Sequence, residues 1–496
     1  MKMKHILGVS AGYHDAAVSV VREDGEIVFA AHSERYSKIK NDPTLSIELV
    51  DAAFNFKIDT IAYYERPWMH NLQQLISREH NFTSLTVQDT LRRHLGANRI
   101  KGRTLRAFPH HLSHAAAGFQ TSSFREAAVV VIDAIGELDT ISIYQASYDK
   151  DNQAQYEKVW GQRYPHSIGL FYSALTKRVG LKPQEEEYIT MGMAAYGDQS
   201  LVPAMGQYAV ADYFNAEFYE NFHIGFDPDR FVGEDNHNIA AAGQWITEKL
   251  IQDIMCKAAH LTRSDNLVYM GGVALNCLAN QYLGRYFNDI WIMPNPGDAG
   301  SSLGAAALAH GRPLRWAGPY LGYNIAGHYP VDAAVECLLR DRICGVASGA
   351  AEFGPRALGN RSLLADPRGS DIKDRVNDIK QRQRFRPFAP VILEEYANEY
   401  FDLPGGFGSS PYMQSVARCL APDLYPAICH VDGSSRVQTV PYDSLSGIRP
   451  LLEAWYAATG CPMLLNTSLN IRGEPMVNDR ADADRFEKLY NVKVLS

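Results

Sequence analysis

The sequence predicts an α/β protein whose N-terminal part contains a duplicated core. Two segments far apart in the chain, residues 5–32 and 127–144, share one plan. In each, a strand-like apolar run leads into a turn with Asp and Gly, and a second strand-like run follows. Helical patterns come after both segments, at 45–55 and 168–179. Alternating strands and helices are typical of α/β folds, and the shared plan predicts the duplication.

The individual elements follow from local patterns. The first segment is expected to form three strands, ILGVS, AAVSVV and IVFAA, with a turn at Asp24-Gly25 between the last two. In the second segment, Asp133 and Gly136 mark the turn between two strands. Residues 240–260 fit a long amphipathic helix. The stretch NLVYMGGVALNCLANQYL then predicts a strand, a Gly-Gly turn and a helix, and DIWIMP predicts a short strand before the small-residue helix of GDAGSSLGAAALAHG.

The chain has 496 residues, too many for one hydrophobic core, so at least two domains are expected. Residues 311–330 are rich in Gly, Pro and Tyr and are expected to act as a linker. We therefore place the first domain at residues 1–324 and the second, also α/β, at 325–496. Lys and Arg are concentrated between residues 356 and 386, inside an otherwise acidic protein.

Composition excludes several classes of function. The net charge of −8 and the pI of about 6.1 argue against binding to a nucleic acid polymer. The seven cysteines are dispersed, with no CxxC pair, which is typical of reduced thiols inside a cell. Apolar runs are too short to span a membrane or to form a signal peptide. A cytoplasmic protein without membrane contact is expected.

Three histidines lie within five positions in RAFPHHLSHAAAGF: His110, His111 and His114. On a helix, the rings of His110 and His114 share one face and can converge on one point. Pro109 suits the first turn of such a helix. Two imidazoles and carboxylates from elsewhere would form a mixed nitrogen and oxygen metal site. Helix capping and packing remain the alternative explanation for these histidines.

Two aspartates and several glycine-rich turns extend this hypothesis. Asp133 follows the apolar run VVVI, and Asp298 lies in PGDAG. Either carboxylate could join a metal site, although each alone also fits a turn or a helix cap. The turns GVSAGYHDAA, MGGVALNC and NPGDAGSSLGAA place backbone N–H groups where anions or nucleotides bind. None matches a P-loop or a dinucleotide fingerprint, so tight-turn glycines remain the alternative.

The basic block of the second domain predicts binding of phosphate groups. Its cations are interleaved with Gly, Pro, Phe and Leu, which favours a binding site over the alternative of a solvated charged face. Arginine forks suit phosphate and carboxylate oxygens. Farther along, LLNTSLNIRGEP places polar residues directly after an apolar strand, where α/β sheets bind ligands. The cations of the block are Arg356, Arg361, Arg368, Lys380, Arg382, Arg384 and Arg386.

Taken together, the motifs resemble the NodU/CmcH family of O-carbamoyltransferases over nearly the whole chain. The resemblance rests on nine motifs in family order: HDAAVSVV, ERYSKIKND, HHLSHAAAGF, MGMAAYG, GGVALNCLAN, PGDAGSSLGAA, EFGPRALGNRSLLADPR, FRPFAP and NTSLNIRGEP. It implies an actin/sugar-kinase-like N-terminal domain that transfers the carbamoyl group. It also implies a YrdC-like C-terminal domain that forms carbamoyl-adenylate from carbamoyl phosphate and ATP.

The resemblance further implies the cofactor, the partners and the role of each site residue. A divalent metal is expected, iron in characterised relatives, with Mg²⁺ a possible companion of ATP. The acceptor would be a small-molecule hydroxyl compound: a sugar, a natural product or a hydroxymethylated nucleotide. The sequence leaves the oligomeric state open between a monomer and a homodimer.

Carried over to this chain, the metal ligands would be His110, His114, Asp133 and Asp298. His14, in YHDAA, would be the general base for the acceptor hydroxyl, because a neutral imidazole accepts a proton near pH 7. The residues that contact carbamoyl-adenylate would be Lys40, Gly271, Gly272 and Asn276. Those that hold carbamoyl phosphate and ATP would be Arg356, Lys380, Arg386, Asn466 and Arg472.

The sequence departs from the family pattern at four positions. Ala350, Ile189, Gln383 and Asn41 stand where the family has Arg, Lys, Glu and His. The change at Ala350 affects one expected phosphate contact. Two other functions stay open: an ATP-dependent binding or switch module of the actin superfamily, and a tRNA threonylcarbamoyl-type transferase. The HxxxH pair and the basic second domain favour the O-carbamoyltransferase over the switch module, and the acidic net charge and the fused second domain argue against the tRNA-modifying enzyme.

Overall fold

The computed structural model describes residues 3–78, 82, 84–383 and 385–496, and it divides into two compact units. Arg384 of the basic block lies outside the described residues. The first unit comprises Met1–Ser33 and Asn41–Ala317, and the second comprises Glu34–Lys40 and Gly318–Ser496.

The second unit includes two segments that a linear division places in the first domain. One is residues 318–324, where the expected linker is wrong in part, because strand β13 (Tyr320–Ile325) pairs with β15 (Gly349–Glu352). The other is Glu34–Lys40, which contains the short helix α1 (Glu34–Ser37). Its buried Arg35 donates a hydrogen bond to the carbonyl oxygen of Gly354 at 2.9 Å. Backbone pairing and a buried side chain therefore decide where these segments belong.

The first unit contains two five-stranded sheets with one topology. In the first sheet, of order β3-β2-β1-β4-β5, β1 is antiparallel to β2 and parallel to β4. In the second sheet, of order β12-β11-β6-β7-β8, β6 is antiparallel to β7 and parallel to β11. The repeat confirms the predicted duplicated α/β core. The strands are β1 His5–Ser10, β2 Ala17–Arg22, β3 Ile27–His32, β4 Ile58–Tyr63, β5 Thr104–Ala107, β6 Glu126–Gly136, β7 Asp139–Tyr148, β8 Ala154–Arg163, β11 Asn266–Met270 and β12 Asp289–Trp291.

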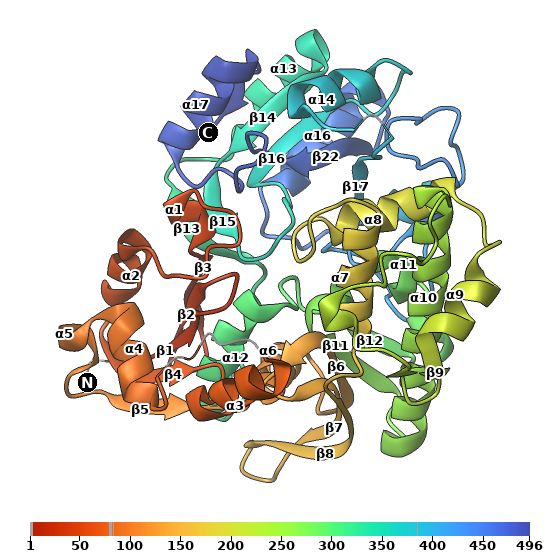
Figure 1. Cartoon of the computed structure of the whole chain (residues 1–496). Helices are drawn as coiled ribbons and strands as arrows, with labels where there is room; N and C mark the ends of the chain where they lie inside the picture. Colours follow the sequence, from red (N-terminus) through yellow and green to blue (C-terminus); the bar gives the residue numbers. More distant parts are fainter. Residues whose placement is uncertain (1–2, 79–81, 83, 384) are drawn as a thin grey trace. The chain divides into compact units, whose positions relative to one another are not determined.

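Two helices lie between these sheets (Figure 1). Helix α12 (Asp298–His310) packs on β1, β2 and β4, and helix α6 (His110–Phe119) packs on β6 and β11. The helices also pack on each other, with Gly304 of α12 against α6. A Cβ atom at Gly304 would lie 1.7 Å from the carbonyl oxygen of Ser113, so only glycine allows this approach. The small-residue composition of both helices thus brings the two halves of the unit together.

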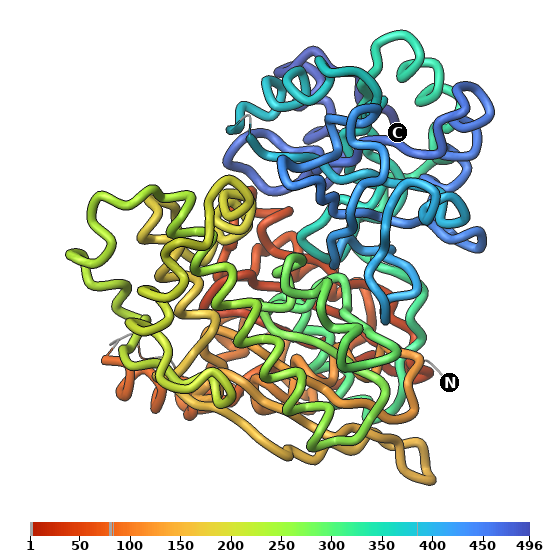
Figure 2. Tube along the Cα trace, turned by 90° about the vertical axis from the view of Figure 1, so that its right-hand side faces the viewer, coloured from red at the N-terminus to blue at the C-terminus, as the bar shows by residue number. Residues whose placement is uncertain are grey.

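The remaining helices cover the outer faces of the first unit. The expected helices at 45–55, 168–179 and 240–260 are confirmed as α2, α7 and α10. The β7–β8 hairpin projects from the edge of the unit (Figure 2). The other elements are α2 Ile47–Phe54, α3 Pro67–Ser77, α4 Val87–Leu95, α5 Ala97–Ile100, α7 Ile168–Arg178, α8 Glu187–Met193, α9 Val202–Ala209, β9 Val210–Asp212, β10 Glu217–Phe218, α10 Asn236–Thr262 and α11 Cys277–Asn280.

The second unit is built on a six-stranded mixed sheet of order β21-β17-β22-β16-β14-β23. Side chains alternate between two hydrophobic clusters, so that Met463 and Leu465 of β22 lie in one and Leu464 in the other. Both faces are therefore buried. The strands are β14 Ile343–Ala347, β16 Arg361–Ala365, β17 Ala389–Leu393, β21 Gln438–Val440, β22 Met463–Ser468 and β23 Val494–Leu495.

Helices α13 (Val331–Asp341) and α16 (Ile448–Thr459) contribute to the cluster on one face of this sheet, and α14 (Ile372–Lys380) and α17 (Arg480–Tyr490) to the cluster on the other. The second unit is thus α/β, as expected. Its minor elements are α15 Ala397–Tyr400, β18 Phe401–Asp402, β19 Ala417–Cys419 and β20 Ser434–Ser435. Across the part of the chain that the structure describes, we find no helix with the length and hydropathy needed to traverse a bilayer.

Candidate functional site

Two histidine side chains of α6 converge at the centre of the first unit. The helix begins at His110, directly after Pro109, so that His110 and His114 occupy successive turns of one face. Their Nε2 atoms lie 3.1 Å apart, and both residues are buried. The third histidine, His111, points elsewhere, and its Nδ1 atom lies 2.8 Å from the hydroxyl of Ser142. The spacing of four residues therefore distinguishes the convergent pair from its neighbour.

Two aspartates from other elements complete the cluster. Asp133 was expected at a turn, but β6 continues to Gly136, and the pairing with β7 shifts between Ile132 and Gly136. Such an irregularity redirects side chains, and the Oδ2 atom of Asp133 lies 3.1 Å from Nε2 of His114. Asp298 is the first residue of α12 and does not act as its cap, because Gly297 holds that position. Its Oδ1 atom lies 3.1 Å from Nε2 of His114.

The four side chains have the geometry and chemistry of a metal site. One donor atom from each lies within 4.8 Å of every other, in a group formed by His110, His114, Asp133 and Asp298. Ligands that bind a cation at about 2.0–2.2 Å come about 3 Å from one another. Two imidazoles and two carboxylates suit a divalent transition metal. The residues therefore fit the metal that the sequence resemblance implies.

Surrounding groups orient these donors. The Nδ1 atom of His114 lies 3.0 Å from the carbonyl oxygen of Pro296, an acceptor that requires a proton on Nδ1 and leaves the Nε2 lone pair facing the cluster. The Oδ1 atom of Asp133 accepts hydrogen bonds from the backbone N–H groups of Ala134 at 2.8 Å and Gly272 at 3.4 Å. Such contacts hold a ligand in place before the cation arrives.

Burial and the neighbouring histidines shift the pKa values of the two carboxylates in opposite directions. Burial raises the pKa of Asp133, but the neighbouring imidazoles of His110 and His114 outweigh burial and hold this pKa well below its usual range. For Asp298, burial also raises the pKa, and the charges of His110 and His14 bring it below its usual value. Both carboxylates are therefore anionic at neutral pH, as metal ligands must be.

His14 lies at the rim of the cluster, in the loop after β1. Its Nε2 atom is 3.7 Å from Oδ2 of Asp298, its Nδ1 atom is 3.1 Å from Oδ2 of Asp15, and its side chain is 28% exposed. Burial lowers the pKa of His14, but Asp298 and Asp15 outweigh it and raise the pKa to about 9. Without a cation the imidazole thus carries a proton, whereas a cation between Asp133 and Asp298 would offset that effect.

The expected nucleotide turn follows β11. Gly271 has φ +92°, and a Cβ atom there would lie 2.1 Å from the carbonyl oxygen of Ile132, so the position requires glycine. Gly272 contacts Asp133 and therefore joins the turn to the group of four donor residues. The side chain of Asn276 accepts from the N–H of Ala279, capping α11, and exchanges hydrogen bonds with Gln244. The side chain of Asn276 therefore stabilises the turn.

In the second unit, Lys380 is the centre of a cluster of cations. Its ammonium group is buried and donates to the carbonyl oxygen of Ser468 at 2.6 Å and to the side chain of Asn470. Burial lowers the pKa of Lys380 well below its usual value, and the charges of Arg382, Arg386 and Lys40 lower it further. Lys40 was grouped with Gly271, Gly272 and Asn276 by the resemblance, but it belongs to the second unit with Lys380.

The other expected phosphate-binding residues occupy different environments. Arg356 and Arg386 are partly exposed, and Arg472 is exposed. Asn466 is buried in β22 and donates to Gln438 at 2.8 Å and to the carbonyl oxygen of Ala357 at 3.1 Å. By contrast, Arg361 of the same basic block is fully buried and donates to backbone carbonyl oxygens, which is a structural role.

Some residues at these sites could not be identified from the sequence. Glu65 lies 3.6 Å from His110, although 45 positions separate them. In the second unit, the Oε1 atom of buried Glu352 accepts hydrogen bonds from the N–H groups of Leu358, Asn360 and Arg361, so the loop that carries Arg356 winds around this carboxylate. A single acidic residue at a strand end is too common to be selected from sequence alone.

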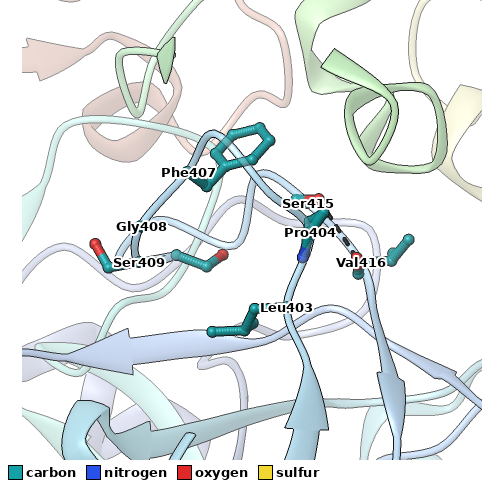
Figure 3. Close-up of a pocket in the computed structure, with 8 residues that line it drawn as sticks. Leu403, Pro404, Phe407, Gly408, Ser409, Ser415 and Val416 are labelled. Carbon is teal, nitrogen blue, oxygen red and sulfur yellow. Dashed lines mark hydrogen bonds between the residues drawn. The ribbon is translucent and has the colours of Figure 1, made fainter. Parts of the chain in front are cut away.

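A small hollow in the second unit does not provide an acceptor pocket. It lies beneath the loop after β18, between Leu403, Phe407 and Ser415 (Figure 3). Its volume of about 10 Å³ accommodates at most a single water molecule. In the same view, the hydroxyl of Ser415 donates to the carbonyl oxygen of Val416 at 3.4 Å.

Fold and site together define a two-unit α/β protein with a buried His and Asp metal-type centre in one unit and a phosphate-type cation cluster in the other. Comparison of the sequence with models of known protein families identifies the family. Residues 57–307 match the model described as carbamoyltransferase N-terminus, and residues 335–496 match carbamoyltransferase C-terminus. The chain belongs to the carbamoyltransferase family, which supports a transferase enzyme.

Similar proteins cover nearly the whole chain. An uncharacterized protein of Synechocystis sp. is 33% identical over 97% of this chain and 94% of its own length. Nodulation protein NolNO of Sinorhizobium fredii is 31% identical over 95% of this chain and 76% of its own length. Among solved structures, (R)-2-hydroxyglutaryl-CoA dehydratase component A of Acidaminococcus fermentans covers 62% of this chain and 97% of its own, at 14% identity. Its TM-score of 0.33 is too low to support an argument.

Proposed function

We propose that the protein is an ATP- and carbamoyl-phosphate-dependent O-carbamoyltransferase. Water cleaves carbamoyl phosphate into carbamate and phosphate, and an oxygen of the carbamate then attacks the α-phosphorus of ATP, so that carbamoyl-adenylate forms and pyrophosphate leaves. A hydroxyl oxygen of the acceptor then attacks the carbamoyl carbon, the bond from that carbon to the AMP oxygen breaks, and a carbamate ester and AMP result. The observation that carries this proposal is the cluster of four donor atoms within 4.8 Å of one another, inside a chain of the carbamoyltransferase family.

In the first unit, the residues of the cluster would hold a divalent metal, iron by family resemblance. When bound, the metal supplies a Lewis acid that polarises the carbamoyl-adenylate and favours AMP as leaving group. His14 takes the proton of the acceptor hydroxyl, since its Nε2 atom lies 3.7 Å from Asp298 at the rim of the centre. Gly271 and Gly272 provide a close backbone approach for the adenylate beside Asp133.

In the second unit, the cations around Lys380 bind the phosphate groups of carbamoyl phosphate and ATP. Arg386 and Lys40 lower the pKa of Lys380 through their positive charges, and a group of cations suits anionic phosphate ligands. Arg356, Asn466 and Arg472 are proposed to complete this site. Fixed cations stabilise the charge that develops during transfer to the α-phosphate of ATP.

The acceptor is proposed to be a small hydroxyl compound: a sugar, a natural product or a hydroxymethylated nucleotide. These share an alcohol of ordinary pKa, which needs both a base and an activated carbamoyl donor. A hydroxyl group beside His14 would meet the first requirement.

The decisive experiment measures exchange of labelled pyrophosphate into ATP. We expect exchange only when carbamoyl phosphate is present, because reversal of adenylate formation requires the carbamoyl group. ATP with labelled pyrophosphate alone is the control. If label fails to enter ATP with both substrates present, the protein does not form carbamoyl-adenylate and the proposal is wrong.

We expect His14→Ala to reduce transfer to an acceptor by about 10²–10⁴-fold, the usual contribution of a general base. Adenylate formation takes place at the cations of the second unit, so pyrophosphate exchange should remain at the wild-type rate. Release of AMP that depends on the acceptor, compared with exchange, measures the two steps separately. Normal transfer by this variant would exclude His14 as the base.

A further inference from the structure

Glu65 is a buried carboxylate directly behind the metal-type centre. It follows β4 by two residues, and its side chain is 9% exposed. Its Oε2 atom lies 3.6 Å from Nδ1 of His110, and its Oε1 atom lies 3.5 Å from Nδ1 of His70. The other ring nitrogen of His110, Nε2, faces Asp298 at 3.2 Å. The imidazole of His110 therefore lies between the donor cluster and Glu65.

We infer that Glu65 is a positioning residue of the proposed metal centre. It accepts the Nδ1 proton of His110 and thereby fixes the tautomer whose Nε2 lone pair faces the cation. Among the described residues, Nδ1 of His110 makes no hydrogen bond although it is buried, and such a group is costly to leave unpaired. A small rotation of the ring brings Nδ1 within reach of Oε2 of Glu65. This inference rests on the metal centre of the proposed function.

Glu65 makes the two histidines unequal. The Nδ1 atom of His114 faces the neutral carbonyl oxygen of Pro296 at 3.0 Å, whereas Nδ1 of His110 faces a carboxylate. A carboxylate behind an imidazole raises its basicity as a metal ligand more than a carbonyl oxygen does. His110 should thus be the stronger donor of the pair, and the difference should disappear when the charge of Glu65 is removed.

Neighbouring contacts hold Glu65 in this position. The ring of Tyr64 lies against the ring of His110, with centroids 5.0 Å apart. The hydroxyl of Ser113 on α6 donates to the carbonyl oxygen of Tyr64 at 2.8 Å. The strand end that carries Glu65 is therefore tied directly to the helix that carries both histidines.

The test measures metal affinity and ligand field in the full-length protein. Wild type, Glu65→Ala, Glu65→Gln and the control Arg66→Gln are stripped of metal and titrated with Co²⁺ against a chelator, and the visible absorption of bound Co²⁺ is recorded. We expect affinity to fall about 100-fold in Glu65→Ala and about 10-fold in Glu65→Gln. The absorption bands should shift in both variants. Arg66→Gln should match wild type, because Arg66 pairs with Glu137 instead of His110.

Circular dichroism of the metal-free proteins establishes that each variant is folded. If Glu65→Ala does not fold, Glu65→Gln, which keeps the size of the side chain, carries the test. Wild-type affinity and an unshifted spectrum in the Glu65 variants would overturn the inference while leaving the metal centre intact. Absence of Co²⁺ binding by wild type would overturn the metal centre as well.

Discussion

Purified His114→Ala is expected to contain less than about a tenth of the metal found in wild type, and to lose carbamoyl transfer by about 10³-fold or more. The Nε2 atom of His114 lies 3.1 Å from an oxygen of each aspartate and 3.1 Å from Nε2 of His110, so it is close to every other member of the cluster. Its removal leaves two carboxylates facing a single imidazole. Elemental analysis of the purified protein gives the metal content.

The chain offers a matched control for this change on the same helix. His111→Asn also removes a buried imidazole of α6, but His111 faces Ser142 at 2.8 Å. Asparagine can place a polar atom near the position of Nδ1, so this variant should keep its metal. Adenylate formation, measured by pyrophosphate exchange, should survive in both variants. Unchanged metal in His114→Ala would reject the proposed ligand set.

In contrast to His114→Ala, the Lys380→Ala variant is expected to keep its metal content and to lose pyrophosphate exchange by about 10²–10³-fold. The ammonium group is fixed by Ser468 and Asn470 at the end of β22, beside Arg382 and Arg386. Removing it takes away the buried charge that the other cations surround. If pyrophosphate exchange by Lys380→Ala stays near the wild-type rate, then other residues bind the phosphate groups.

The pH dependence of substrate binding provides a second test of the role of Lys380. Burial and the neighbouring cations lower the pKa of Lys380 well below its usual value. Below this lowered pKa the side chain is charged and binds phosphate; as the pH rises through it, the charge is lost and affinity for ATP and carbamoyl phosphate should fall. An arginine keeps its charge throughout this range. The KM values of Lys380→Arg should therefore rise less steeply with pH than those of wild type.

Local patterns were enough to predict much of the fold. Alternating apolar runs identified β1, β2 and β3, and the long amphipathic pattern identified α10. These elements depend on side-chain periodicity, which is a property of neighbouring residues. The expected linker at 311–330 was wrong in part because Tyr320–Ile325 gains its strand structure by pairing with β15, a partner that composition does not reveal.

The candidate metal site was open to prediction because half of it is local. His110 and His114 are four residues apart on one helix, Asp133 directly follows the apolar run VVVI, and Asp298 lies in a motif of the carbamoyltransferase resemblance. Glu65 was missed because it lies just beyond the end of β4, far from His110 in the sequence, and only the fold brings the two side chains together. The family resemblance assigned Lys40 to the carbamoyl-adenylate site, and the sequence did not reveal that its segment packs in the second unit.

The sequence by itself determined the duplicated α/β core, the convergent histidines of one helix and the family to which the chain belongs, since each depends on short-range spacing or on motif identity. Tertiary structure alone decided which distant groups meet. Asp298 reaches His110 across 188 positions because Gly304 allows α12 to approach α6, and Glu65 reaches it because Ser113 ties α6 to the end of β4. Close approach of elements depends on packing in three dimensions, which no local pattern encodes.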